Sequence, residues 1–283
     1  MDHFQRALDI DPAFARAYAG LADCHLLMTN VDPDQHAPLA KAAAAARKAL
    51  DLDAALVEAH TSLGLILMKQ WHWAESEREY RRAIELDPNY STAHHWYAEY
   101  LNAEGRFDEA LAEIGHAGAL DPLSQIIATD RGKILFYARR YTEAIAQLTS
   151  VLQDDPAFGE AIRWLAPSYA AAERYEESLT ALDRYRDDTQ MALIFDLRGY
   201  VLARMGRRAE ALRIAADMQR RGWGNSFYIH LGLGDREGAL ATLDENFVRW
   251  GPTLTGLKVD PMYDGLRGDP RFQRFLQRMG LAE

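Results

Sequence analysis

Aromatic and small residues recur along this chain with a fixed period. Pro88, Pro122 and Pro156 lie 34 residues apart. Fifteen residues before each proline, and before Gln190 one period further on, the chain has an aromatic residue, with a glutamate two positions after it and then a small residue. The aromatic positions are Trp73, Phe107, Tyr141 and Tyr175. A period of this length indicates stacked repeats, each burying its apolar face on its neighbours, and not one globular core.

Small residues within each period predict two helices that pack closely. The first helix has a small residue at Gly64, Ala98, Gly132 and Ala166. The second has Ala83 and Ala117 at its equivalent place, then the larger Val151 and Tyr185. Small side chains let two helix backbones approach each other. We expect the aromatic residue to open the second helix, and the proline to fit the first turn of the next unit.

These positions resemble the tetratricopeptide repeat, a helix–turn–helix unit of 34 residues. Spacing, aromatic, small residues and proline agree over four consecutive units. The resemblance implies an all-α fold, a right-handed superhelical solenoid of such repeats. The chain departs from the family near the start of the first helix, where the family favours tryptophan. The residues found there are His60, His94, Ala128 and Ile162.

The period also predicts how the chain is organised. We expect a solenoid over residues 1–246, with a half repeat at 1–12 and six to seven repeats after it, and capping helices over 247–283. Because the half repeat lacks its first helix, the sequence suggests a fragment or separated tail of a longer protein. In the capping region, Asp260-Pro261 and Asp269-Pro270 each look like a helix cap followed by proline.

Composition narrows the classes of partner and compartment. The formal net charge of −10 argues against a general nucleic-acid or anionic-membrane binder, which needs a basic face. Cys24 is the only cysteine, which excludes an internal disulfide and suits a reducing compartment. No signal peptide and no apolar run near the ~20 residues of a membrane helix is found. We therefore expect a cytoplasmic protein without membrane insertion.

A closer resemblance lies in the stretches "WHWAESEREYRRAIELDPNYSTAHHWYAEYL" and "KVDPMYDGLRGDPRFQRFLQRMGL". They look like the C-terminal repeat region of bacterial multidomain regulators. In those proteins similar repeats follow a class III nucleotide cyclase, a winged-helix DNA-binding domain or a serine/threonine kinase domain. The resemblance implies a sensory or partner-binding module in signalling, without the activities of those effector domains.

Histidines and the cysteine invite a metal or catalytic interpretation. His60 and His94 occupy equivalent places in adjacent units, but His94 and His95 point about 100° apart on a helix. No carboxylate or cysteine completes a ligand set with them along the sequence, so packed or solvated histidines are the simpler interpretation. Cys24 and His25 diverge on their helix in the same way. We predict no catalytic, cofactor or metal site.

First helices usually line the concave face of such a stack. If the chain follows the family, the partner-binding residues are Thr61, Leu65, His95, Glu99, Asn102, Thr129, Lys133, Phe136, Arg163 and Tyr200. Lys133 and Arg163 are the cations of this set and could hold an acidic peptide group, with pairing to Glu99 or other carboxylates as the alternative. Trp71, in the turn between helices, is either a partner contact or packed against the previous unit.

The sequence therefore predicts a non-catalytic, all-helical scaffold that binds a protein or peptide in its concave groove. A second hypothesis is a self-associating module, and hence a possible homodimer, because the half repeat would expose Phe4 and Leu8. An enzyme with a site in the groove is a third hypothesis, which no acid/base pair, nucleophile set or metal set supports.

Overall fold

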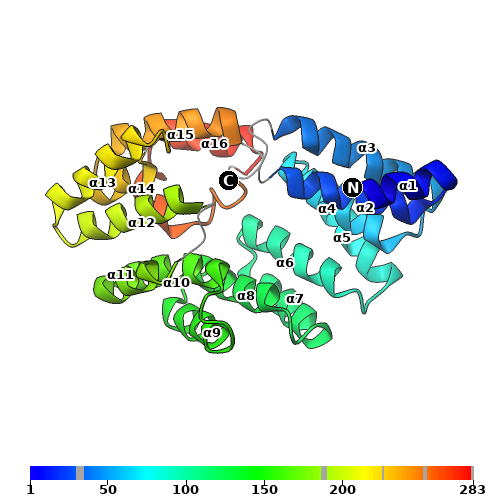
Figure 1. Ribbon diagram of the computed structural model, residues 1–283, viewed down its shortest axis with the longest axis horizontal. Helices are drawn as coiled ribbons and strands as arrows, with labels where there is room; N and C mark the ends of the chain where they lie inside the picture. The colour runs from blue at the N-terminus through cyan, green and yellow to red at the C-terminus, as the bar shows by residue number, and fades with distance from the viewer. Residues whose placement is uncertain (30–34, 186–189, 225, 251–253, 282–283) are drawn as a thin grey trace. The chain divides into compact units, whose positions relative to one another are not determined.

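The described part of the chain consists of helices joined by short turns, and it contains no strand (Figure 1). The all-α fold expected from the sequence is confirmed in this computed structural model. The structure describes residues 1–29, 35–185, 190–224, 226–250 (without the side chains of 248–250) and 254–281.

The chain divides into two compact units. Unit 1 comprises residues 1–123, 248–258 and 279–281. Unit 2 comprises residues 124–247, 259–278 and 282–283. Each unit thus combines a long continuous stretch with shorter C-terminal stretches, so neither is a single segment of the sequence.

Unit 1 is built from helices that pack in consecutive pairs. The helix bounds are α1 Asp2–Ile10, α2 Ala15–Met28, α3 His36–Leu52, α4 Val57–Lys69, α5 Trp73–Leu86, α6 Ser91–Glu104 and α7 Phe107–Leu120. α2 packs on α3, α4 on α5 and α6 on α7, and α3 and α5 each contact the first helix of the following pair. The repeated helix pair is therefore the packing unit that the 34-residue period predicts.

Unit 2 is also built from helices that pack in consecutive pairs, and it has shorter helices towards its C-terminus. The bounds are α8 Gln125–Tyr137, α9 Tyr141–Asp154, α10 Gly159–Ala171, α11 Tyr175–Asp183, α12 Met191–Arg204, α13 Arg208–Arg220, α14 Phe227–Leu233, α15 Arg236–Trp250, the 3₁₀ helix η3 Pro261–Leu266 and α16 Pro270–Arg278. α9 packs on α8 and on α10, α10 on α11, and α12 on both α13 and α14.

The repeated aromatic residue opens the second helix of each pair, as the sequence predicts. Trp73, Phe107, Tyr141 and Tyr175 are the first residues of α5, α7, α9 and α11. In unit 2 the Tyr141 ring lies 5.9 Å from the ring of Phe136, the penultimate residue of α8. The aromatic side chain thus packs against the end of the preceding helix, which fixes the turn between the two.

The prediction that the repeated proline lies in the first turn of the next helix was wrong. Pro88 lies in the turn that joins α5 to α6, three residues before α6 begins, and not in the first helical turn. Asp87 sets this turn, because its carboxylate accepts a hydrogen bond from the Asn89 backbone N–H at 2.9 Å. The carboxylates of Asp53 and Asp155 accept the same hydrogen bond from the backbone N–H two positions later. An aspartate that binds its own backbone in this way favours a turn over a continued helix.

Small residues allow the close approach of paired helices. A Cβ placed on Gly64 would lie 2.8 Å from the Tyr80 ring, and one on Gly132 would lie 2.5 Å from Leu148 Cγ. The serine hydroxyl of Ser76 donates to the Gly64 carbonyl at 2.8 Å across the same contact. Glycine on one helix therefore makes room for a fully buried side chain on its partner.

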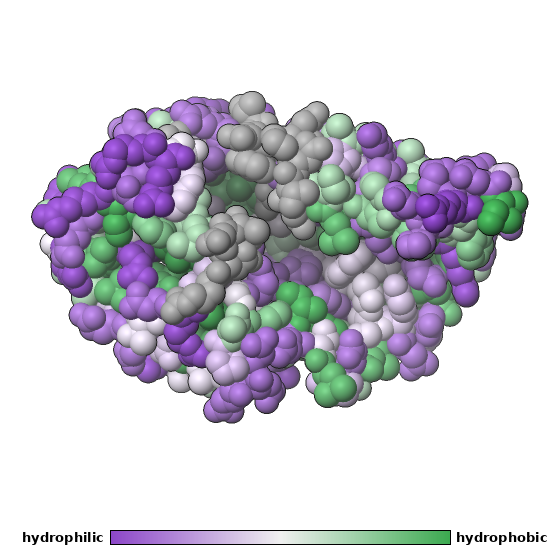
Figure 2. All heavy atoms as spheres, in the orientation of Figure 1, coloured by the Kyte–Doolittle hydropathy of each residue, from purple (hydrophilic) through white to green (hydrophobic). Residues whose placement is uncertain are grey.

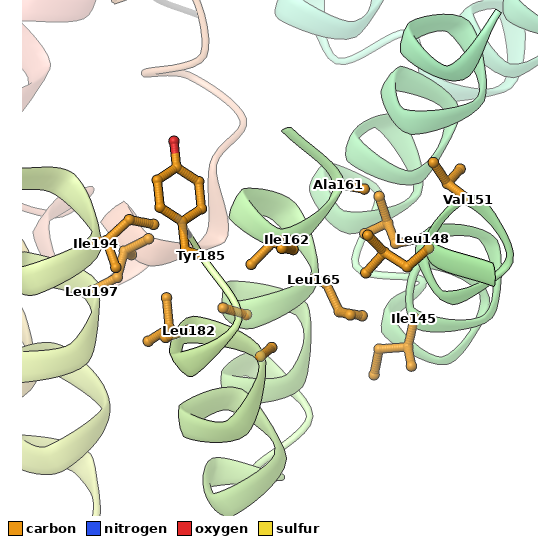
Figure 3. Close-up of a cluster of buried hydrophobic side chains, with 13 residues drawn as sticks. Ile145, Leu148, Val151, Ala161, Ile162, Leu165, Leu182, Tyr185, Ile194 and Leu197 are labelled. Atoms are coloured by element: carbon orange, nitrogen blue, oxygen red, sulfur yellow. The ribbon is translucent and has the colours of Figure 1, made fainter. Parts of the chain in front are cut away.

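A cluster of buried aliphatic side chains forms the core of unit 2. Figure 3 shows Ile162 and Leu165 of α10 between Leu148 of α9 on one side and Leu182 and Ile194 on the other. Because each helix contributes side chains to both of its neighbours, the core extends along the stack instead of closing into a sphere.

Asp196 of α12 stabilises the start of the short helix α14. Its two carboxylate oxygens accept hydrogen bonds from the backbone N–H groups of Tyr228 and Ile229 at 3.0 and 2.9 Å. Burial raises the pKa of Asp196 to about 7, against the effect of those backbone donors. A side chain from another helix thus serves as the cap, while the local Ser226 makes no side-chain cap.

The C-terminal helices of unit 2 pack on one another through aromatic side chains. The rings of Phe247 and Phe275 lie 4.8 Å apart, and those of Tyr263 and Phe272 lie 5.9 Å apart. As the sequence indicates, Asp260 begins a helix before proline: its carboxylate accepts the Met262 N–H at 2.8 Å, and the helix is a short 3₁₀ turn.

The outer surface of unit 2 is polar and extensively ion-paired. Figure 2 shows hydrophilic residues over α13, at the left of the view. On this helix Asp217 pairs with both Arg220 and Arg221, at 3.1 and 2.9 Å. Such exposed pairs add little to stability, which rests on the buried helix contacts. Among the described residues, no helix combines the length and apolarity needed to cross a membrane.

At the N-terminus the structure corrects one expectation. Leu8 is buried, with 7% of its surface exposed, and does not present the open apolar face that the sequence suggested. The Phe4 ring lies against Gly20 of α2 and leaves no room there for a Cβ. α1 therefore packs closely on α2, although Phe4 keeps 37% of its surface exposed.

Candidate functional site

Several residues expected to line the groove are packed inside the repeats. Thr61, Asn102, Thr129 and Phe136 are buried, and His95 is 9% exposed. The Thr61 hydroxyl donates to the Val57 carbonyl of its own helix at 2.9 Å. Residues of the first helix face both their partner helix and the next repeat, so a position chosen by spacing alone need not reach solvent. These side chains support packing and offer little surface to a partner.

The remaining expected residues are partly exposed. They are Leu65 and Glu99 in unit 1, and Lys133, Arg163 and Tyr200 in unit 2. Trp71, for which the sequence left two interpretations, is half-buried and has a positive φ of 63°. The partly exposed residues of unit 2 lie on α8, α10 and α12, which are first helices of consecutive pairs.

Trp164 on α10 brings the two predicted cations of unit 2 together. The Lys133 ammonium lies 5.7 Å from the Trp164 ring centroid, and the Arg163 guanidinium lies 5.4 Å from it. The Tyr137 ring meets the same indole edge-on at 5.4 Å, and buried Phe136 lies 6.0 Å away. A half-buried indole flanked by two cations is a candidate contact for a partner, because both its apolar face and the cations can bind.

Acidic residues on the same helices neutralise these cations. Lys133 pairs with Asp130 at 2.8 Å, and Arg163 pairs with Glu160 at 3.2 Å. The sequence left open that these cations pair with Glu99 or with other carboxylates, and in the structure they pair with Asp130 and Glu160. Two cations and two carboxylates leave the Trp164 cluster with no net charge, so a partner's carboxylate must compete with Asp130 and Glu160 for these cations.

Sequence reasoning missed Trp164 as the centre of this cluster. A signal was available, because Trp96 stands two full periods earlier, at the equivalent place on α6. Trp96 is also half-buried and packs beside the core cluster of unit 1. Comparing aromatic residues at equivalent repeat positions would have identified both indoles.

A segment of the chain itself lies against the first helices of unit 2. Met262 in η3 packs on the core cluster formed by α9, α10, α11 and α12. Asp264 accepts two hydrogen bonds from the Arg139 guanidinium, at 2.7 and 3.0 Å. Burial raises the pKa of Asp260, at the start of this segment, to about 7. The segment is thus held by the two-point ion pair and by apolar side chains, since Met262 packs on the core cluster and buried Tyr263 packs against Phe227 and Phe272.

A pocket of about 300 Å³ remains beside that segment in unit 2. Its lining comes from the first helices and from the segment: Tyr141, Pro167, Ala171, Tyr200, Arg204, Leu231, Pro261, Met262, Asp264 and Gly265. Pro167 follows Trp164 by three positions on α10, which places both on one side of that helix. We call Lys133, Trp164, Tyr200 and Arg204, which are partly or fully exposed, the first-helix surface of unit 2.

A second cluster in unit 1 corrects the sequence analysis. His94, Glu113 and His116 bring three possible metal-ligand atoms within 4.8 Å of one another. The sequence analysis found no carboxylate to complete a set with His94, because Glu113 and His116 belong to the next helix, α7. A readable signal was the Glu-x-x-His spacing on α7, which puts both side chains on one face.

The fold and these surfaces define a class of protein: a repeat protein built from stacked helix pairs. Tetratricopeptide repeat family models match residues 57–90, 79–112 and 135–200. Tetratricopeptide repeats are therefore recognised in both units. No curated protein sequence matches the chain.

Solved structures with the same architecture resemble the chain at low identity. PilW, a widely conserved type IV pilus biogenesis factor, is 19% identical with a TM-score of 0.61, over 73% of this chain and 92% of that chain. Pseudomonas aeruginosa pilF is 17% identical with a TM-score of 0.53, over 87% and 96%. The human IFIT1 dimer with m7Gppp-AAAA is 16% identical with a TM-score of 0.68, over 98% and 66%. These likenesses establish the fold.

Proposed function

We propose that this chain is a non-catalytic scaffold that binds a protein or peptide on the first-helix surface of unit 2. Tetratricopeptide repeats generally serve as protein-interaction scaffolds, and stacked first helices offer an extended surface to one peptide. The observation that carries the proposal is the chain's own segment Asp260–Asp264, which lies on this part of unit 2. The net charge of −10 favours a protein partner over nucleic acid.

The seated segment indicates the chemistry of the partner. It offers an apolar Met262 to the helix core and, two residues later, the carboxylate of Asp264 to Arg139. A partner segment of the same kind has an apolar side chain followed by an acidic one. Trp164 would contact the apolar group, and Arg139, Lys133 or Arg163 would bind the acid.

The test uses a labelled synthetic peptide with the sequence of residues 258–266, KVDPMYDGL, titrated into the full chain. Asp264→Ala loosens the resident segment, so we expect it to raise the affinity for the peptide about fivefold or more. Arg139→Ala removes the carboxylate partner and should lower the affinity in the Asp264→Ala background about tenfold. Arg213→Ala, on the exposed surface of α13, is the matched control and should leave both values unchanged.

Charge reversal at the two cations beside Trp164 tests whether they take part in binding. Lys133→Glu combined with Arg163→Glu should weaken binding of the acidic peptide at least tenfold, because both cations beside Trp164 become repulsive. Circular dichroism checks that the double variant stays helical. Equal binding by the wild-type chain, this variant and Trp164→Ala would exclude unit 2 as the binding surface.

Self-association is a second candidate, favoured by exposed apolar residues at the N-terminal end of unit 1. Ile10 is 87% exposed, Phe14 43% and Phe4 37%. Exposed apolar groups can be buried by contact with a second copy of the chain. Light scattering over a hundredfold concentration range should show a dimer that Ile10→Asp abolishes. A strict monomer at every concentration contradicts this candidate.

We also propose that the chain serves as the sensory or regulatory part of a larger, cytoplasmic bacterial signalling protein. Support comes from the resemblance of its repeat and C-terminal stretches to those of multidomain regulators. The coding sequence next to the one for this chain provides the test. A cyclase, winged-helix or kinase domain in the same reading frame supports the proposal, and an unrelated gene with its own start and stop contradicts it.

A further inference from the structure

Two helices of unit 1 bring a histidine–carboxylate–histidine set together. His94 lies on α6, and Glu113 and His116 lie three residues apart on α7. His94 Nδ1 is 2.6 Å from Glu113 Oε2, and the His94 and His116 rings meet edge-on with centroids 5.6 Å apart. We propose that these three side chains bind one zinc ion, which links α6 to α7.

The ligand set suits zinc. Two imidazole nitrogens and one carboxylate oxygen are ligands that Zn²⁺ takes in tetrahedral sites, with a fourth position left for water or another group. His116 is exposed and Glu113 is half-buried, so an ion can enter from solvent. Glu113 also lines a surface pocket of about 420 Å³, so solvent reaches its carboxylate.

The hydrogen bonds of His94 orient it as a ligand. Its Nε2 lies 3.0 Å from the Pro88 carbonyl, and a carbonyl oxygen can only accept, so Nε2 carries a proton. Nδ1 faces the Glu113 carboxylate at a hydrogen-bond distance, so a proton lies between them in the metal-free chain. Zinc bonded to both atoms at about 2.0–2.2 Å in tetrahedral geometry would release this proton and move the two atoms apart. A backbone carbonyl that binds the second ring nitrogen is the usual support for a metal-bound histidine.

The preceding repeat provides an internal comparison. His60 Nδ1 lies 2.6 Å from Glu79 Oε2, and His60 Nε2 lies 3.1 Å from the Ala54 carbonyl. This pair is therefore the His94–Glu113 pair displaced by one period. The position equivalent to His116 is occupied there by Arg82, a cation that cannot bind a metal ion. The histidine–glutamate pair is thus common to both repeats, and the third ligand occurs in only one.

In the first experiment, zinc chloride is titrated into the full chain after a chelator has removed bound metal, and calorimetry measures the binding. We expect one ion per chain at the high-affinity step. His116→Ala and Glu113→Gln should each weaken that step at least tenfold, since each removes a ligand. His116 is exposed, so its variant should fold normally, which circular dichroism verifies. Glu79→Gln, the matched change in the preceding repeat, should leave zinc affinity unchanged.

A second experiment adds the missing ligand to the preceding repeat. Arg82→His completes a second set with His60 and Glu79, so we expect two zinc ions per chain in place of one. Cobalt(II) reports on geometry, because tetrahedral coordination gives visible absorption bands that should disappear in His116→Ala. The proposal is wrong if His116→Ala binds zinc with the same stoichiometry and affinity as the wild-type chain, or if Arg82→His adds no ion.

Discussion

Single residues at the turn inside each repeat adopt a backbone conformation that usually requires glycine. Gly105 has a φ of 82°, and Trp71, Arg139 and Glu173 have φ values of 63°, 61° and 59° at the equivalent positions. A left-handed residue after a helix satisfies the last carbonyl groups of that helix, and it costs about 1 kcal/mol when the residue is not glycine. Three repeats therefore carry a local strain that the fourth avoids.

Glu173→Gly should relieve this strain. Glu173 is exposed, so its side chain contributes little packing, and the free energy of unfolding should rise by about 1 kcal/mol. The midpoint of urea unfolding measures the change. Gly105→Ala is the opposite control, expected to lower the midpoint by a similar amount, and a fall for Glu173→Gly would contradict the argument.

His60 links stability to pH at the residue scale. Burial disfavours the charged form, but hydrogen bonds to Glu79 and to the Ala54 carbonyl outweigh both burial and the nearby Arg82, so the pKa of His60 is raised. Below the unfolded-state pKa of about 6.5, both states are protonated and the interaction stabilises the fold fully. As pH rises through the folded-state pKa, this stabilisation is lost.

As pH rises above about 6.5, the unfolding midpoint should therefore fall more steeply in the wild-type chain than in His60→Gln. At pH 6 the free energy of unfolding should be about 1 kcal/mol higher in the wild-type chain than in His60→Gln. This difference separates the contribution of His60 from those of the other histidines. Urea titrations at a series of pH values measure it. Parallel curves would show that the Glu79 contact does not alter the protonation of His60.

How closely two paired helices pack depends on whether a glycine of one helix faces the other. Gly132 on α8 faces the fully buried Leu148 of α9, whereas Gly115 on α7 has nothing within 4 Å of where its Cβ would be. The two glycines thus have the same chemistry and different surroundings. One allows a close helix contact, and the other only weakens its helix.

The same substitution at these two sites should have opposite effects. Gly132→Ala should lower the free energy of unfolding by about 1–3 kcal/mol, because a buried side chain must move. Gly115→Ala should raise it by about 1 kcal/mol through helix propensity. Urea unfolding of both variants measures this, and a stabilised Gly132→Ala chain would argue against the close contact of α8 with α9.

Stability in the whole molecule is a sum of contacts between neighbouring elements. In unit 2 the Phe272 side chain of α16 is fully buried and its ring lies 5.9 Å from Tyr263. On the same helix Arg271 forms a two-point pair with Glu237 of α15, at 2.9 and 2.7 Å. A stack of repeats that touch only their neighbours loses stability locally when one contact is removed.

Phe272→Ala should therefore act locally although it costs about 3–5 kcal/mol. Hydrogen exchange should accelerate most in η3, α15 and α16. It should change least in α2 and α3, which pack on each other and on α4. Mass spectrometry of peptides from each helix measures this gradient. Uniform loss of protection over the chain would indicate one cooperative unit instead.

The helix pairs were predictable because their signals are local and repeated. Trp73 and Tyr141 open their helices at the residues that the spacing indicated. Surface exposure was less predictable, since the spacing placed Phe136 on the groove and the structure buries it. Burial depends on which neighbour a helix face meets, and the period does not contain that information.

The sequence alone determined the repeat, its two helices and the turns between them, because these follow from side-chain size and backbone preference within 34 residues. The tertiary structure decided which distant side chains meet. It placed Met262 on the helices of unit 2 and brought His94 beside Glu113 and His116. Such contacts depend on how neighbouring helices pack, and helix packing joins residues from different elements that no local pattern connects.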